Sequence, residues 1–322
     1  MIYLDNASTT RVNEEVLNEM MPYFNQYYFN ASSNHLDGLK TKKVIENARK
    51  LCAEIIQAES SEIIFTSGAT ESINYALKGF YEENFERGNH LITCKTEHKA
   101  VLKTCEYLET KGIEVTYLDV DSNGLIDLNE LENSITPETA LIAIMYANNE
   151  TGVIQDIQLI GDIAKKHNLS FFCDATQAIG KVDIDVNELN IDMLCMSAHK
   201  INGPKGIGFL YVKNGLMLTP LIHGGSQEND NRGGTYNTPL IIGLGKACEL
   251  AKRYIDKTAK VYKEIWETVL KFIEKTNNIL IVGDLNQRLF NIINLKINNL
   301  DASVFVESSI EDENNIFSLK TA

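Results

Sequence analysis

The sequence predicts an α/β protein with a large domain built around a mostly parallel seven-stranded sheet flanked by helices, and an incomplete small α+β domain after it. Short apolar runs alternate with amphipathic stretches along the chain, which is typical of strands alternating with helices. The 322 residues exceed the roughly 150 residues of an average domain, which favours one large and one small domain.

Seven short apolar runs are predicted as strands because each is rich in β-branched, aromatic or other large apolar residues. They are residues 62–67, 90–94, 114–120, 140–147, 169–174, 192–197 and 208–213. Helices are expected between them. In residues 69–80, for example, Ile73, Ala76, Leu77 and Phe80 recur at helical spacing and form one apolar face that should pack against the sheet.

The second domain is predicted from the pattern after residue 240. Residues 240–275 form a long amphipathic segment that suits a helical bridge. Residues 290–297 follow as a predicted strand and residues 303–308 as a weaker one. We therefore assign residues 15–240 to the large domain. Residues 1–14 and 241–322 are assigned to a truncated small domain with its bridging helix.

Composition excludes several classes of protein. Forty-four acidic residues against 30 basic ones give a formal net charge of −14, which repels a nucleic-acid backbone. No run approaches the roughly 18 apolar residues of a membrane span, and the N-terminus lacks the features of a signal peptide, so a cytoplasmic protein is expected. The six cysteines form no CxxC pair, so neither structural zinc nor a disulfide framework is expected.

Two predicted strand ends carry the strongest chemical pattern. Asp174 ends one strand, and Lys200 follows the next strand 26 residues later. Parallel strands deliver such residues to one edge of the sheet, where α/β proteins bind ligands. Pyridoxal 5′-phosphate (PLP) needs a lysine to hold its aldehyde and an acid to keep its ring nitrogen protonated. Either residue alone would be read as a solvated side chain or a cap, but together they favour a PLP site.

Three weaker signals lie at the same predicted edge. The turn Ser67-Gly68-Ala69 leads into a helix that starts near Thr70, whose N–H groups can hold a phosphate, although such turns are often only caps. His98 follows the strand 90–94 and could stack on a flat cofactor and move protons, or could simply cap a helix. Asn149 follows the strand 140–147 and allows the same two interpretations.

Eight motifs in register resemble the cysteine desulfurases of the class V aminotransferase group, which have PLP-dependent transferase fold type I. The motifs are YLDNASTT (3–10), NASSNH (30–35), TSGATES (66–72), TEHKAV (96–101), NNETG (148–152), DATQ (174–177), SAHK (197–200) and GGSQENDNRGGT (224–235). The resemblance extends from residue 2 to about residue 297. It implies removal of sulfur from L-cysteine, giving L-alanine and an enzyme persulfide that passes sulfur to an acceptor protein.

The resemblance also implies roles for individual residues. Lys200 would carry PLP as a Schiff base, Asp174 would pair with the ring nitrogen, and His98 would lie on the ring face. The other implied contacts are Gln177 and Asn149 with the ring hydroxyl, Ala69, Thr70, Ser197 and His199 with the phosphate, and Thr235 with the phosphate of the second subunit in a homodimer.

Two expected features of the family are absent from this sequence. No cysteine follows Cys248, where the family has a mobile cysteine loop, and no arginine matches the one that binds the substrate carboxylate. Cys94, Cys173 and Cys195 are expected to be core residues rather than replacements. We therefore expect the chain as given to bind PLP but to be inactive or impaired in persulfide formation.

Two alternatives remain open at this point. Another class V enzyme, such as an aminotransferase or a cysteine or selenocysteine lyase, would not need the mobile cysteine. A non-catalytic PLP-binding relative that dimerises with a complete enzyme would need neither missing feature. Product analysis separates these possibilities, because a transaminase requires a keto acid and a lyase releases sulfide or selenide without a persulfide.

Overall fold

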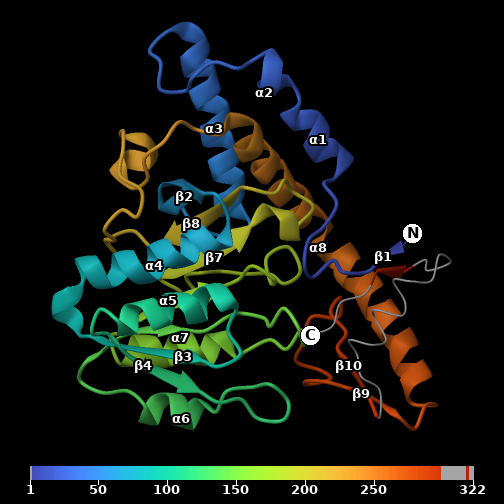
Figure 1. The fold of residues 1–322 in the computed structure, drawn as a ribbon. Helices are drawn as coiled ribbons and strands as arrows, with labels where there is room; N and C mark the ends of the chain where they lie inside the picture. The colour runs from blue at the N-terminus through green and yellow to red at the C-terminus, as the bar shows by residue number, and fades with distance from the viewer. Residues whose placement is uncertain (1, 299–316, 319–322) are drawn as a thin grey trace.

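The computed structural model describes residues 2–298 and 317–318, and it contains one seven-stranded sheet with the order β2-β8-β7-β6-β5-β3-β4 (Figure 1). The strands are β2 (Ile63–Thr66), β3 (His90–Cys94), β4 (Glu114–Leu118), β5 (Thr139–Ala143), β6 (Ser170–Asp174), β7 (Met193–Ser197) and β8 (Gly208–Val212). Strands β4, β3, β5, β6 and β7 are parallel, whereas β8 is antiparallel to both β7 and β2. The predicted mostly parallel seven-stranded sheet is confirmed.

Helices cover both faces of this sheet. The α-helices of the described residues are α1 (Glu14–Met20), α2 (Pro22–Asn25), α3 (Leu36–Glu54), α4 (Ala69–Glu83), α5 (Lys99–Glu109), α6 (Leu128–Asn133), α7 (Ile157–Lys166) and α8 (Thr238–Ile273). The apolar sides of α4 and α5 pack with one buried cluster, and those of α3, α7 and α8 pack with another. Strands β3, β5, β6 and β7 are buried throughout, which explains their nearly continuous apolar sequences.

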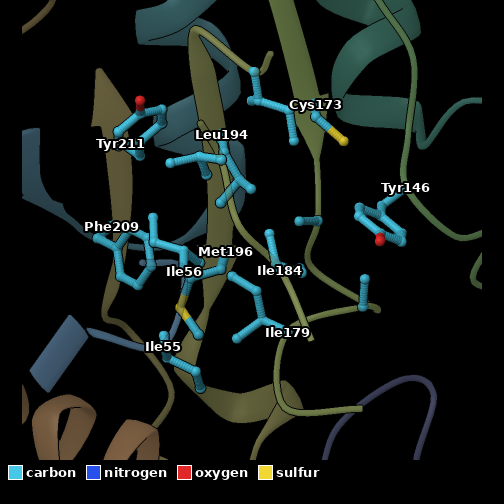
Figure 2. Close-up of a cluster of buried hydrophobic side chains, with 14 of the residues drawn as sticks. Ile55, Ile56, Tyr146, Cys173, Ile179, Ile184, Leu194, Met196, Phe209 and Tyr211 are labelled. Atoms are coloured by element: carbon cyan, nitrogen blue, oxygen red, sulfur yellow. The ribbon is translucent and has the colours of Figure 1, made fainter. Parts of the chain in front are cut away.

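Successive strand residues point into opposite clusters, as the pleat of a strand requires. In β5, Ile142 belongs to the cluster under α3, α7 and α8, whereas Leu141 belongs to the cluster under α4 and α5. Figure 2 shows part of the first cluster, where Leu194 and Met196 of β7 lie near Phe209 of β8. The sheet is therefore a central layer between two apolar cores.

Helix α8 corresponds to the predicted bridge over residues 240–275. Its first half packs along α3, where Gly245 allows close approach because an added Cβ would lie 2.7 Å from the Cβ of Ala48. Its second half places Trp266 under Arg288, whose guanidinium carbon lies 4.2 Å from a ring centroid of the indole. The helix thus links the sheet to the segment that follows it.

The predicted strand at residues 290–297 is only partly confirmed. Strand β10 (Leu295–Ile297) pairs antiparallel with β9 (Ile279–Ile281), but the residues before it form turns. The reason is that Arg288 donates a 2.8 Å hydrogen bond to the carbonyl of Ile292, so this carbonyl is held by a side chain rather than by a ladder. The strand predicted at 303–308 lies outside the described residues.

The two-domain division remains a prediction, although one pairing links distant parts of the chain. Strand β1 (Ile2–Tyr3) pairs parallel with β11 (Phe317–Ser318). Within the part of the chain that the structure describes, no helix is long and apolar enough to cross a membrane.

A buried ion pair closes the edge of the sheet at β2. Arg49 of α3 and Glu228 are only 6% and 5% exposed, and their two hydrogen bonds are 2.6 and 2.7 Å long. Arg49 also donates to the carbonyl of Ile63, and the N–H of Phe65 donates to Glu228. The pair therefore hydrogen-bonds to backbone groups at the open edge of β2, and it holds residues 224–235 against this edge.

Glu228→Ala should lower the free energy of unfolding by about 3 kcal/mol, because it leaves the Arg49 guanidinium buried without its carboxylate. Urea denaturation measures the change. The matched control is Glu106→Ala, which removes an exposed pair with Lys103 and should cost less than about 1 kcal/mol. Equal losses in the two variants would contradict this account of the edge.

Candidate active site

A cavity of about 1780 Å³ lies at the edge of the sheet where the parallel strands end. Its walls come from the N-terminal segment, from the residues that follow β2, β3, β5, β6 and β7, and from the segment around β10. Nine of the ten predicted site residues line it: Ala69, Thr70, His98, Asn149, Asp174, Gln177, Ser197, His199 and Lys200. The volume exceeds that of a typical small-ligand pocket, roughly 300–1000 Å³, so a cofactor and a substrate fit together.

Lys200 lies on a short 3-10 helix (Ala198–Lys200) directly after β7. Its Nζ donates hydrogen bonds to the carbonyls of Ala7 and Ser8, the second at 3.0 Å. Residues 7–13 are fixed over this turn, since Thr10 N donates to the carbonyl of His199 and Asn13 N to that of Asn202. The N-terminal segment is therefore a wall of the site.

Sequence reasoning assigned no role to this N-terminal wall. The motif YLDNASTT was one available signal, but nothing in its composition indicates that it contacts a lysine about 190 positions away. Lys205 and the residues around β10 that line the cavity were also missed. All of these residues reach the site because the chain folds back on itself. Local sequence patterns do not predict where it does so.

Asp174 ends β6, next to β7, and its side chain is buried. Thr176 N and Cys195 Sγ donate to its Oδ1, at 3.0 and 3.4 Å. Oδ2 has no hydrogen-bond donor among the described residues, although the side chain lines the cavity. A carboxylate on the wall of the cavity suits a cationic N–H group of a ligand.

The start of α4 forms the anion-binding end of the cavity. Gly68 precedes the helix with a φ of +144°, and no side chain caps the helix. The first N–H groups of a helix attract anions, and they are open where no side chain caps them. An added Cβ at Gly68 would lie 3.3 Å from Ser197 Oγ, so a side chain here would fill the space between these groups.

His199 completes this end of the cavity as a neutral imidazole. Its Nδ1 lies 3.0 Å from Thr9 Oγ1. Burial, together with the charges of Lys200 and Lys205, lowers the pKa of His199 to about 4. A neutral ring keeps one N–H for donation and adds no positive charge beside the two lysines.

His98 and Asn149 lie on other walls of the cavity. His98 caps α5, and its Nδ1 accepts a 3.1 Å hydrogen bond from Ala100 N, which places the proton of the neutral ring on Nε2. Its side chain is exposed toward the cavity it lines. Both interpretations of His98 are therefore compatible, because it caps a helix and also faces the site.

Thr235 is the predicted residue that the structure does not bring into this cavity. It is exposed and follows the segment held by the Arg49–Glu228 pair. Arg232 of the same segment pairs with Glu71 of α4 at 2.9 Å. The Arg49–Glu228 and Arg232–Glu71 ion pairs thus hold the segment that precedes Thr235, and Thr235 itself is exposed.

Comparison with known proteins identifies the family. The sequence profile of the class-V aminotransferases matches residues 2–316. This chain belongs to the class V aminotransferase family. The cysteine desulfurase IscS of Methanosarcina thermophila is 46% identical over 294 residues, covering 91% of this chain and 73% of the relative. The cysteine desulfurase IscS of Neisseria meningitidis serogroup C is 47% identical over 300 residues, or 92% of this chain and 74% of the relative.

Solved structures agree with this family membership. A NifS-like protein superposes with a TM-score of 0.92 at 39% identity, over 95% of this chain and 84% of that one. A structure described as SspA in complex with cysteine has a TM-score of 0.76 at 47% identity, over 77% of this chain and 72% of that one. The predicted fold type I and the predicted membership of the cysteine desulfurase group are confirmed.

The cofactor of this enzyme family is PLP, and the residues of the cavity fit it. One end offers the open start of α4 with Ser197 for a phosphate, and the middle offers Asp174 for a protonated ring nitrogen. Lys200 lies on the strand end next to that of Asp174, in reach of an aldehyde in the same cavity. This donor set matches the three chemically distinct parts of the cofactor.

The six cysteines are all buried, which confirms the prediction that Cys94, Cys173 and Cys195 are core residues. Burial raises the pKa of each of these three thiols well above its usual value, and the carboxylates of Glu97 or Asp174 raise it further. A protonated thiol within a strand is a poor nucleophile.

We expect His199 to stay neutral through the physiological pH range in the cofactor-free protein. NMR titration should show its transition near pH 4, whereas an unfolded histidine titrates near 6.5. Because the unfolded chain binds this proton more readily, stability should fall as the pH drops from about 6.5 toward 4. The His199→Asn protein identifies the resonance, and a transition near pH 6.5 would show that burial and the charges of Lys200 and Lys205 do not hold the ring neutral.

Proposed function

We propose that this protein is a PLP-dependent cysteine desulfurase that removes sulfur from L-cysteine and leaves L-alanine. The observation that carries the proposal is the placement of Lys200 and Asp174 on adjacent strand ends in one cavity, in a chain whose relatives are named cysteine desulfurases. The related SspA structure in complex with cysteine supports the choice of L-cysteine as substrate.

When bound, PLP supplies an electron sink that weakens the bonds around the substrate α-carbon. Asp174 keeps a proton on the ring nitrogen, which this sink requires. Lys200 holds the cofactor before the substrate arrives, and its released amine can then take a proton from the α-carbon and return it. The carbonyls of Ala7 and Ser8 accept from its ammonium form and hold it at this position.

The remaining contacts orient the ring. Ala69 and Thr70 would bind the phosphate through the N–H groups of α4, with Ser197 and His199 as side-chain donors. Gln177 and Asn149 would hydrogen-bond the ring hydroxyl, and His98 would cover the ring face. The position of these residues on the cavity wall supports the assignments.

We further propose a homodimer in which Thr235 contacts the phosphate held by the partner. Thr235 is exposed and lies outside its own chain's cavity. A run of large apolar side chains is also exposed between residues 17 and 39: Leu17, Met21, Phe24, Tyr27, Tyr28, Leu36 and Leu39. Exposed apolar surface of this extent is typical of an interaction site.

Desulfuration needs a thiolate that attacks the sulfur of the substrate. The new S–S bond forms as the Cβ–S bond breaks, and the electron pair stays with the carbon skeleton that becomes alanine after protonation. None of the six buried cysteines can reach the cavity as a mobile thiolate. We therefore propose that the thiol that accepts sulfur is not one of these six.

The purified protein should be yellow with PLP, and borohydride should fix the cofactor to Lys200. Lys200→Ala should abolish this adduct, and Asp174→Ala should lower cofactor affinity at least about tenfold, because a buried charged hydrogen bond is worth roughly 1.5–3 kcal/mol. Absorption spectroscopy and peptide mass spectrometry provide the measurements. A borohydride adduct on another residue in Lys200→Ala would refute the assignment.

Sedimentation should show a dimer at micromolar concentration. Tyr28→Asp places a charge on the exposed apolar surface and should shift the protein toward monomer, since Tyr28 is 70% exposed and its ring stacks on that of the neighbouring Phe29. The control Tyr107→Asp changes an exposed tyrosine on α5 and should leave the dimer intact. A PLP-saturated wild-type monomer would argue against a shared phosphate site.

Single turnover with L-cysteine should leave no persulfide on any of the six cysteines, and little sulfur should be released from this chain alone. The physical reason is that all six thiols are buried within the fold. Mass spectrometry of the peptides and analysis of alanine, pyruvate and sulfide test this. Pyruvate with free sulfide would indicate a lyase, and a persulfide on Cys94 would show that a strand thiol can act after all.

A further inference from the structure

Lys181 contacts the site indirectly, through Gln177. It lies four residues after Gln177, in the turn that follows β6, and it is not among the described residues that line the cavity. Its Nζ donates a 2.6 Å hydrogen bond to the main-chain carbonyl of Gln177 and a 3.4 Å hydrogen bond to the side-chain Oε1. No step of the reaction described above uses this lysine.

These contacts determine which way the Gln177 carboxamide points. Gln177 is 4% exposed, and its Nε2 donates a 2.9 Å hydrogen bond to the carbonyl of Ala7. A carbonyl can only accept, so the NH₂ group must face Ala7, and the oxygen then faces Lys181, whose Nζ donates to it. A flipped amide would place two acceptors together at Ala7 and would remove the side-chain acceptor of Lys181.

The same carbonyl of Ala7 also accepts from Lys200. Lys181, Gln177, Ala7 and Lys200 therefore form one hydrogen-bonded group, which we call the Gln177 network. Two lysines at its ends repel each other, and burial together with the charge of Lys200 lowers the pKa of Lys181 to about 7. Lys181 is thus held beside a second cation although the two charges repel each other. A lysine that only contacts solvent would not need this position.

We propose that Lys181 is a positioning residue that locks the Gln177 carboxamide with its NH₂ group toward the cavity. One N–H of this group is held by Ala7, and the second is left to donate to the ring hydroxyl oxygen of PLP. The inference rests on the cofactor placement given under the proposed function. It adds a residue that does not touch the cofactor but determines which atom of Gln177 does.

The test compares Lys181→Met, Gln177→Ala and the double variant in the full chain. Titration of each cofactor-free protein with PLP gives the dissociation constant and the absorption maximum of the bound cofactor. Gln177→Ala should weaken PLP binding about tenfold and shift the absorption maximum, since one hydrogen bond to a charged ligand is lost. Lys181→Met should change both quantities in the same direction.

The double variant should bind PLP no more weakly than Gln177→Ala, because Lys181 acts only through the missing amide. Lys103→Met is the matched control on the surface of α5, and it should match wild type. Melting temperatures of the cofactor-free variants report any loss of fold. If Lys181→Met does not fold, the same comparison is made with Lys181→Gln, which keeps a polar side chain of similar volume.

Two results would overturn the inference on different grounds. The first is either an additive loss of PLP affinity in the double variant or a wild-type dissociation constant and spectrum in Lys181→Met. Either outcome would show that Lys181 does not act through Gln177, and the cofactor placement would be unaffected. A wild-type dissociation constant and spectrum in Gln177→Ala would instead refute the cofactor placement itself, and the inference with it.

Discussion

The parallel pairing of β6 with β7 is the constraint on which the site depends. Asp174 is in register with Cys195, and Ser197 and Lys200 follow on the same side of the sheet edge. A slip of one residue in this ladder would turn the Asp174 side chain to the other face of the sheet. The register is held because β6 and β7 are buried on both faces, so a slip would expose or clash with the packed apolar side chains.

Packing of the N-terminal segment converts that sheet edge into a cavity. The carbonyls of Ala7 and Ser8 are acceptors for Lys200, and Ala7 also orders Gln177. The same turn receives the backbone hydrogen bonds of Thr10 and Asn13. Backbone carbonyls thus help to hold the Lys200 ammonium group at the edge of the sheet.

Burial has opposite consequences for the two kinds of reactive group in this fold. At the strand ends, it strengthens the hydrogen bonds of Asp174 and keeps His199 neutral. Inside the strands, it keeps the thiols of Cys173 and Cys195 protonated and immobile. The sheet therefore places the cofactor-binding groups at its edge and keeps the thiols in its interior unreactive.

The sequence by itself determined the seven strands, the long helix α8 and nine of the residues that line the cavity, because these depend on local apolar patterns and on motifs at strand ends. It did not determine the short turns before β10, where the Arg288 side chain competes with the ladder for a carbonyl. Only the tertiary structure decided that Ala7 lies on Lys200, that Glu228 closes the edge of β2 and that Lys181 orients Gln177. The physical reason is that each of these contacts depends on how a turn or loop folds back against the sheet edge, and that arrangement is fixed by the packed sheet rather than by the residues next to it in the chain.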